Sequence, residues 1–118
     1  MTGRKRYLQP FDMLLNAVHD LAELQKARTV SCDSARGIVG LEIIMYNRAR
    51  EYWFEVGYSE GGICEVVIKL SGEDDEAERA RLVDHEFALL DYVMKDRARF
   101  DIAAIEELDR TAAGDGAR

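Results

Sequence analysis

The sequence contains little that would indicate secretion, metal binding or redox chemistry. Its two cysteines, Cys32 and Cys64, lie far apart and form no CxxC pair, so neither a disulfide framework nor a zinc site is indicated. No Asn-x-Ser/Thr acceptor site is present. Cys64 lies in an apolar run and is predicted to be a small buried core residue. We therefore expect a reduced, cytoplasmic protein.

Long apolar runs and proline are also scarce. The apolar stretch after Arg6 is interrupted by Asp12, Asp20 and Glu23, so it predicts neither a signal peptide nor a membrane-spanning helix. The single proline favours long regular elements. A chain of 118 residues has the usual length of one domain. We expect that domain over residues 1–110, followed by a disordered tail rich in Ala and Gly over residues 111–118.

Basic residues are outnumbered by acidic ones, 16 against 23, which gives a formal charge of −7. Arg4, Lys5 and Arg6 contribute three of the positive charges, and residues 1–8 are predicted to be a frayed basic N-terminus. The remaining chain is more acidic still, and such a surface repels phosphate backbones. Direct binding to nucleic acid or to a membrane is therefore not expected.

The spacing of apolar residues predicts both helices and strands. A helix should start at Pro10 and end near Arg28, because its apolar residues recur three and four positions apart. The Ser-, Asp- and Gly-containing stretch 29–37 predicts a loop. Alternating residues over 38–46, 51–58 and 63–70 predict three strands, and the short connections between them favour an antiparallel meander.

Two further helices are predicted after the strands. A long one should follow Gly72, where a run of four acidic residues (73–76) suits the positive end of a helix dipole. A short last helix should begin at Asp101 as its N-cap. The predicted fold is α+β: a two-layer sandwich of order α-β-β-β-α-α, with a three-stranded antiparallel meander packed on helices.

Two patterns resemble catalytic or metal-binding motifs. Residues 57–61 match the G-x-S-x-G nucleophile elbow, but a strand pattern follows where an elbow requires a helix, so a hairpin turn is favoured. His19 and His85 belong to no HExxH motif and accompany no cysteine pair. The sequence therefore predicts no enzyme, no bound metal and no cofactor.

The most informative pattern is the second face of the predicted sheet. One face is apolar and should pack against the helices: Leu41, Ile43, Tyr52, Phe54, Val56, Val66 and Ile68. The opposite face mixes apolar and acidic residues, which is typical of a contact surface. Its predicted partner-binding residues are Glu42, Ile44, Tyr46, Glu51, Trp53, Glu55, Glu65 and Val67. The alternative is that a helix of the same chain covers this face.

Two functions from different classes fit these observations. The first is a small acidic protein-binding module, similar in size and charge to inhibitors and immunity proteins and in element order to small chaperones. Its partner would be a basic, nucleic-acid-handling protein or a second copy of the chain. The alternative is a small-ligand-binding protein or enzyme with a pocket between sheet and helices, for which Tyr52, Tyr58, Cys64 and His85 are the polar candidates.

Overall fold

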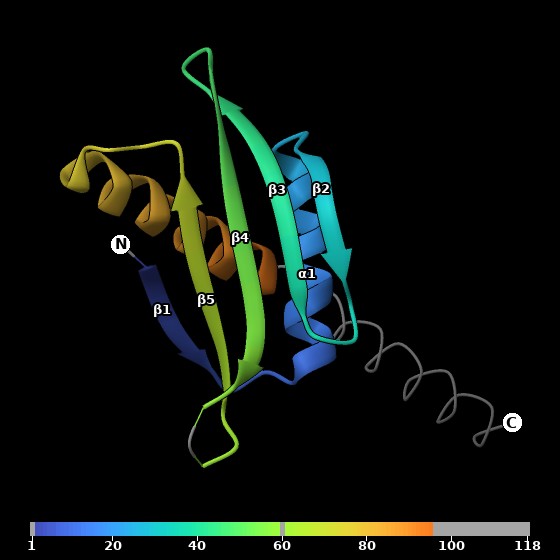
Figure 1. Ribbon diagram of the computed structural model, residues 1–118. Coiled ribbons are helices and arrows are strands. Elements are labelled where there is room, and N and C mark those ends of the chain that lie inside the picture. Colours follow the sequence, from blue (N-terminus) through green and yellow to red (C-terminus); the bar gives the residue numbers. More distant parts are fainter. Residues whose placement is uncertain (1, 60, 96–118) are drawn as a thin grey trace, which may run out of the picture.

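A computed structural model describes residues 2–59 and 61–95. Its element order is β1 (Thr2–Tyr7), α1 (Phe11–Leu24), β2 (Arg28–Asp33), β3 (Ile38–Met45), β4 (Arg48–Tyr58) and β5 (Cys64–Ser71). A second helix follows and covers residues 76–95 of the described chain (Figure 1). The α+β class is confirmed, but the predicted order α-β-β-β-α-α is wrong because two strands were not recognised. The predicted last helix and tail lie outside the described residues.

The strands form one antiparallel five-stranded sheet of order β1-β5-β4-β3-β2. The predicted meander is its centre, with Leu41 paired to Tyr52 and Phe54 paired to Ile68. A two-residue turn joins β3 to β4, and both of its residues, Tyr46 and Asn47, have positive φ angles of 54° and 61°. This is the geometry of a type I′ hairpin, whose twist matches that of the flanking strands.

The N-terminal residues form an edge strand, so the predicted frayed end is wrong. β1 pairs with β5 from Thr2↔Lys69 to Tyr7↔Cys64. Its inner side faces the second helix, where the Tyr7 hydroxyl donates to Asp91 Oδ1 at 2.9 Å and Lys5 also binds Asp91. A Cβ atom at Gly3 would lie 2.3 Å from Val83 Cγ1, so strand and helix approach closely at this point.

The stretch 29–37, predicted to be a loop, contains the other missed strand. β2 pairs with β3, with an irregularity between Thr29 and Ser31. Gly37 ends the connection to β3 with a φ of +71°, which glycine adopts without steric cost. The turn residues were therefore recognised correctly, but the strand before them was not.

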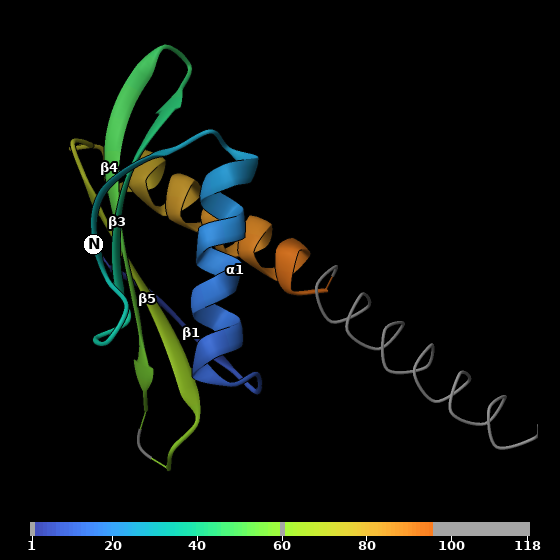
Figure 2. The ribbon, with the colours of Figure 1, turned by 90° about the vertical axis from the view of Figure 1, so that its right-hand side faces the viewer.

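Both helices lie on the same side of the sheet (Figure 2). α1 begins after Pro10 and buries Leu14, Leu15, Ala17, Val18, Leu21 and Ala22. All seven residues predicted for the inner sheet face are buried, at 0–2% exposure. Within the described residues no helix covers the outer face, so the intramolecular cover considered as an alternative is not seen there. No described helix is long and apolar enough to cross a membrane.

Candidate functional site

The predicted partner-binding residues lie on the outer face of the sheet and in the β3–β4 turn. Ile44 and Tyr46 are the most accessible, at 69% and 76% exposure. Trp53 and Val67 are only partly exposed. A Cβ atom at Gly40 would meet the Trp53 ring at 3.0 Å and Val30 Cγ2 at 2.9 Å. The indole therefore packs on the sheet instead of projecting from it.

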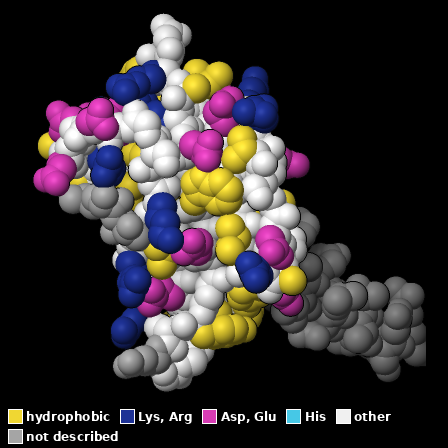
Figure 3. All heavy atoms as spheres, viewed as in Figure 1, with side chains coloured by type: hydrophobic (Ala, Val, Ile, Leu, Met, Phe, Trp, Pro, Cys, Tyr) yellow, Lys and Arg dark blue, Asp and Glu magenta, His cyan; other side chains and the backbone are white. Residues whose placement is uncertain are grey.

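The four predicted rim glutamates are all paired on the same face. Glu42 binds Arg28, Glu65 binds Arg4, Glu55 binds Lys69, and Glu51 accepts a 2.6 Å hydrogen bond from Trp53 Nε1. The hydrogen bond and charge of Arg28 lower the pKa of Glu42. Basic, acidic and apolar side chains are accordingly interspersed over this face (Figure 3). The acidic field expected to attract a basic partner is therefore largely neutralised in place.

Truncating Trp53 should affect folding more than truncating the neighbouring exposed residues. Because the indole packs over Gly40 and binds Glu51, we expect Trp53→Ala to lower the free energy of unfolding by about 1–2 kcal/mol. Ile44→Ala and Tyr46→Ala should change it by less than about 0.5 kcal/mol. Urea denaturation of the three variants tests this expectation. Equal effects would show that the indole contributes no more packing than its exposed neighbours.

The G-x-S-x-G match lies at the end of β4 and in the connection to β5, and the strand β5, not a helix, follows it. Gly57 and Tyr58 end β4, and Ser59 Oγ donates to the carbonyl of Ile63 at 2.9 Å within the connection to β5. The described residues contain no group of three or more metal-ligating side chains. His19 lies half-buried on α1, and His85 lies exposed on the second helix.

The interior between sheet and helices contains a polar cluster that had not been predicted. Tyr52 on the inner face of β4 and Glu86 on the second helix are both fully buried at 0% exposure, and Arg50 on β4 is 7% exposed. Tyr52 Oη, Glu86 Oε2 and Arg50 Nη1 have no hydrogen-bond partner among the described residues. A buried polar group left without a partner costs about 1–3 kcal/mol. Three such groups in one small core need an explanation.

Glu86 joins the cluster to α1. Gln25, the C-cap residue of that helix, donates from Nε2 to Glu86 Oε1 at 2.7 Å. Burial raises the pKa of Glu86 to about 7, although the Gln25 hydrogen bond acts in the opposite direction. Burial, followed by the charge of Glu86, raises the pKa of Tyr52 to about 12. The carboxyl group therefore changes charge near neutral pH, whereas the phenol stays protonated.

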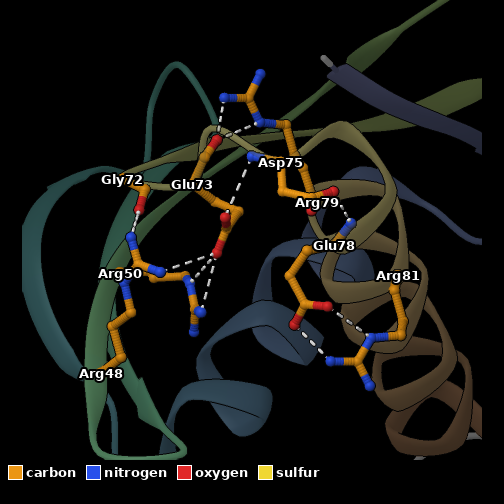
Figure 4. Close-up of polar contacts among 8 residues, drawn as sticks. All are labelled: Arg48, Arg50, Gly72, Glu73, Asp75, Glu78, Arg79 and Arg81. Atoms are coloured by element: carbon orange, nitrogen blue, oxygen red, sulfur yellow. Dashed lines mark hydrogen bonds and ion pairs between the residues drawn. The ribbon is translucent and has the colours of Figure 1, made fainter.

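Glu73 binds Arg50, one member of this cluster, and also Arg48 (Figure 4). Its Oε2 accepts bonds from Arg50 Nε and Nη2 at 3.2 and 3.0 Å and from Arg48 Nη1 at 3.3 Å. Its other carboxylate oxygen accepts the backbone N–H of Asp75, and its backbone carbonyl accepts the Arg79 guanidinium. The Asp75 N–H and the two arginines hold the pKa of Glu73 below its usual range against the effect of burial. This residue thus ties the start of β4 to the start of the second helix.

A pocket of about 440 Å³ opens between the β3–β4 turn and the second helix. It is lined by Ile44, Met45, Tyr46, Arg81, Leu82 and His85. Leu82 is also a core residue at 2% exposure, and it lies one helical turn before Glu86 on the same helix face. The described chain therefore places a surface pocket one turn away from the buried cluster.

Comparison with known proteins identifies the fold. No family model and no curated protein matches the sequence. The structure of Ara h 8.0201 superposes with a TM-score of 0.55 at 10% identity, covering 80% of this chain and 94% of that one. The fold is the Bet v1-like helix-grip fold.

A second helix-grip structure is StfQ, the di-domain ARO/CYC protein of the steffimycin biosynthetic pathway. It superposes with a TM-score of 0.50 at 13% identity. The match covers 81% of this chain but only 44% of StfQ, so the chain spans less than half of that protein. At such low identities the likeness concerns the fold alone.

The helix-grip arrangement separates the four polar residues considered for a ligand pocket. Tyr52 belongs to the buried cluster and His85 to the pocket beside it. Tyr58 and Cys64 line a different pocket of about 310 Å³, near the β1–α1 connection. Only Tyr52 was therefore both predicted for a ligand site and found among the unpartnered groups.

The sequence contained signals for Arg50 and Glu86, the two residues of the buried cluster that were not predicted as site residues. Arg50 has the same strand parity as the apolar residues Tyr52 and Phe54, so alternation already placed it on the inner face. Glu86 lies four residues after Leu82 and three before Leu89, within the apolar stripe of its helix. A charged residue at a core position is uncommon and often functional.

Proposed function

We propose that this protein binds a small, mainly apolar ligand inside the helix grip, between the inner sheet face and the two helices. The observation that carries the proposal is the pair of fully buried, unpartnered atoms Tyr52 Oη and Glu86 Oε2. Ligand sites are typically apolar with a few polar groups that fix orientation. A ligand that supplied hydrogen bonds to these two atoms would remove the cost of burying them.

The pocket beside Leu82 is the proposed entrance. It borders the second helix one turn before Glu86, and its lining combines apolar side chains with Tyr46, Arg81 and His85. Displacement of the Leu82 side chain would join this pocket to the cluster. We also propose that the protein binds its ligand without chemical conversion and works in the cytoplasm. Its two cysteines are free thiols in the structure.

Removing only the hydroxyl of Tyr52 tests the site. Naphthylmethanol, titrated with the protein and followed by amide NMR, should shift resonances of β4 and the second helix around Tyr52 and Glu86. We expect Tyr52→Phe to weaken this binding about fivefold, the effect of one lost neutral hydrogen bond. It should leave stability unchanged or slightly higher, because an unpartnered hydroxyl is removed.

Tyr58→Phe is the matched control, since Tyr58 lies on the same strand but is 68% exposed. It should bind naphthylmethanol like the unmodified protein. Saturable shifts confined to the outer face, or no saturable binding by naphthylmethanol at all, would contradict the proposed function.

Protein binding through the outer face is a second proposal, supported by the exposure of Ile44 and Tyr46 side by side at the end of β3. Because the rim glutamates are already paired on the sheet, they attract a basic partner less strongly than the sequence suggested. If the partner is a second copy of the chain, we expect sedimentation to show a dimer for the unmodified protein and a monomer for Ile44→Ser. A monomer at every protein concentration would contradict self-association.

A further inference from the structure

We infer that the interior of the helix grip selects a ligand carrying a protonated amine, which Glu86 Oε2 and Tyr52 Oη hold by hydrogen bonds. This inference rests on the proposed function and adds to it the chemical class of the ligand. Both acceptor atoms are fully buried and without a partner in the described chain. An ammonium group carries three N–H donors and no acceptor, so it can satisfy both atoms at once.

The hydrogen bonds around Glu86 leave one of its oxygens for a ligand. Gln25 occupies Oε1 at 2.7 Å and fixes the carboxyl group from α1. No described cation binds the other oxygen, although buried carboxylates are usually paired. Arg50, the nearby cation on β4, binds Glu73 through Nε and Nη2, and its remaining nitrogen, Nη1, is the third unpartnered atom of the cluster.

The charges acting on the cluster also favour a cation. Three carboxylates, those of Glu86, Glu78 and Glu73, raise the pKa of Tyr52, whereas only Arg50 lowers it. Among these charges, that of Glu86 acts most strongly on the Tyr52 hydroxyl, ahead of the opposing charge of Arg50. At the proposed entrance, Arg81 is bound to Glu78 from its own helix, so its positive charge is balanced. A negative interior stabilises an ammonium group and disfavours a carboxylate.

The charge state of Glu86 makes amine binding depend on pH. Its elevated pKa of about 7 means that the free protein carries a mostly protonated carboxyl group at pH 6 and a mostly ionised one at pH 8. Gln25 from α1 donates a hydrogen bond to Glu86, and Tyr52 from β4 lies close enough for the charge of Glu86 to act on its hydroxyl. Arg50 on β4, Glu78 on the second helix and Glu73 before that helix are the other charged groups that act on Tyr52. An amine must displace the Glu86 proton at pH 6, which weakens binding about tenfold relative to pH 8.

Three probes that share one apolar ring distinguish the possible ligand classes: naphthylmethylamine, naphthylmethanol and naphthoate. Calorimetric titration at pH 8 should give about tenfold tighter binding of the amine than of the alcohol, because a charge-assisted hydrogen bond replaces a neutral one. Naphthoate should bind most weakly. Only the amine should lose about tenfold in affinity at pH 6.

Glu86→Gln removes the charge and keeps an amide that can still bind Gln25. We expect it to abolish the preference for the amine and its pH dependence, while the alcohol binds within about threefold of its original affinity. Glu76→Gln is the matched control: it makes the same change on the same helix at an exposed position. It should preserve the preference, which separates a specific site from general attraction of amines to an acidic protein.

The outcomes separate the two proposals. Equal binding of the amine and the alcohol, or tighter binding of naphthoate, overturns the amine assignment and leaves the proposed function standing. A preference for the amine that survives in Glu86→Gln also overturns it. Absence of binding by all three probes overturns the proposed function itself.

Discussion

Glu86→Gln should stabilise the protein at pH 8 and leave it almost unchanged at pH 4. Burial raises the pKa of this carboxyl group from 4.5 to about 7. Both the folded and the unfolded states are protonated well below pH 4.5, so the residue then carries no charge penalty. As the pH rises from 4.5 to 7, the unfolded state ionises first and stability is lost. Above pH 7 the loss is complete, at about 3 kcal/mol.

Urea denaturation between pH 4 and pH 8 measures this difference directly. The unmodified protein should lose stability across that interval relative to Glu86→Gln, and the two curves should converge at low pH. Glu76→Gln, which alters an exposed acid, should run parallel to the unmodified protein. Parallel curves for Glu86→Gln as well would show that the carboxyl group titrates normally in the folded state. At the proposed site, a bound ligand that paired with the ionised carboxylate would offset this cost.

Gly37→Ala should cost more than about 3 kcal/mol of stability, because two separate obstacles coincide at this residue. Its φ angle is +71°, which costs an L-residue about 1–2 kcal/mol. A Cβ atom would also lie 2.4 Å from the carbonyl oxygen of Val56 and 2.8 Å from the Phe11 ring. The Gly37 carbonyl accepts the Val56 N–H at 2.8 Å, so backbone movement to relieve the clash would break that bond.

Two other glycines separate the two obstacles. Gly72 has a φ of +91°, but no atom lies within 4 Å of the position that a Cβ atom would take there, so Gly72→Ala should cost only the conformational part, about 1 kcal/mol. Gly57 has neither obstacle, and Gly57→Ala should change stability by less than about 0.5 kcal/mol. Thermal and urea denaturation of the three variants should give that order. If Gly37→Ala cost no more than Gly72→Ala, the contact with Val56 would be easily relieved.

Alternation of apolar residues was sufficient to predict the centre of the sheet but not its edges. In β3, β4 and β5 one side of each strand is buried, and this leaves a period of two in the sequence. β1 contains Arg4, Lys5 and Arg6 in succession, so it has no apolar alternation. Its strand conformation depends on pairing with β5, more than 50 residues away in the sequence. β2 is exposed along most of its length and leaves no burial pattern either.

The candidate site was predictable only in part, for a related reason. Periodicity predicted only Tyr52 on the inner face; the same period, applied to Arg50 and Glu86, puts them at inward positions too, but it carries no information about which polar atoms find partners. That depends on contacts such as Gln25 with Glu86 and Glu73 with Arg50, which join residues 61 and 23 positions apart. On the outer face the same limitation hid the ion pairs, so the rim appeared more acidic in the sequence than in the structure.

The attachment of the second helix determines how the interior can open. At one end the chain is fastened to β4 through Glu73, and near the other end Asp91 fastens it to β1. These two strands are separated in the sheet by β5. The second helix, with the residues just before it, therefore crosses the sheet from β4 to β1 and is bonded to each of these two strands. Between the two attachments it is held mainly by apolar packing of residues such as Leu82 and Leu90. Glu86 lies between these two attachments and is itself bound to Gln25 of α1. For the proposed ligand to enter, we expect the apolar contacts of this middle part to open while the bonds of Glu73 and Asp91 stay in place.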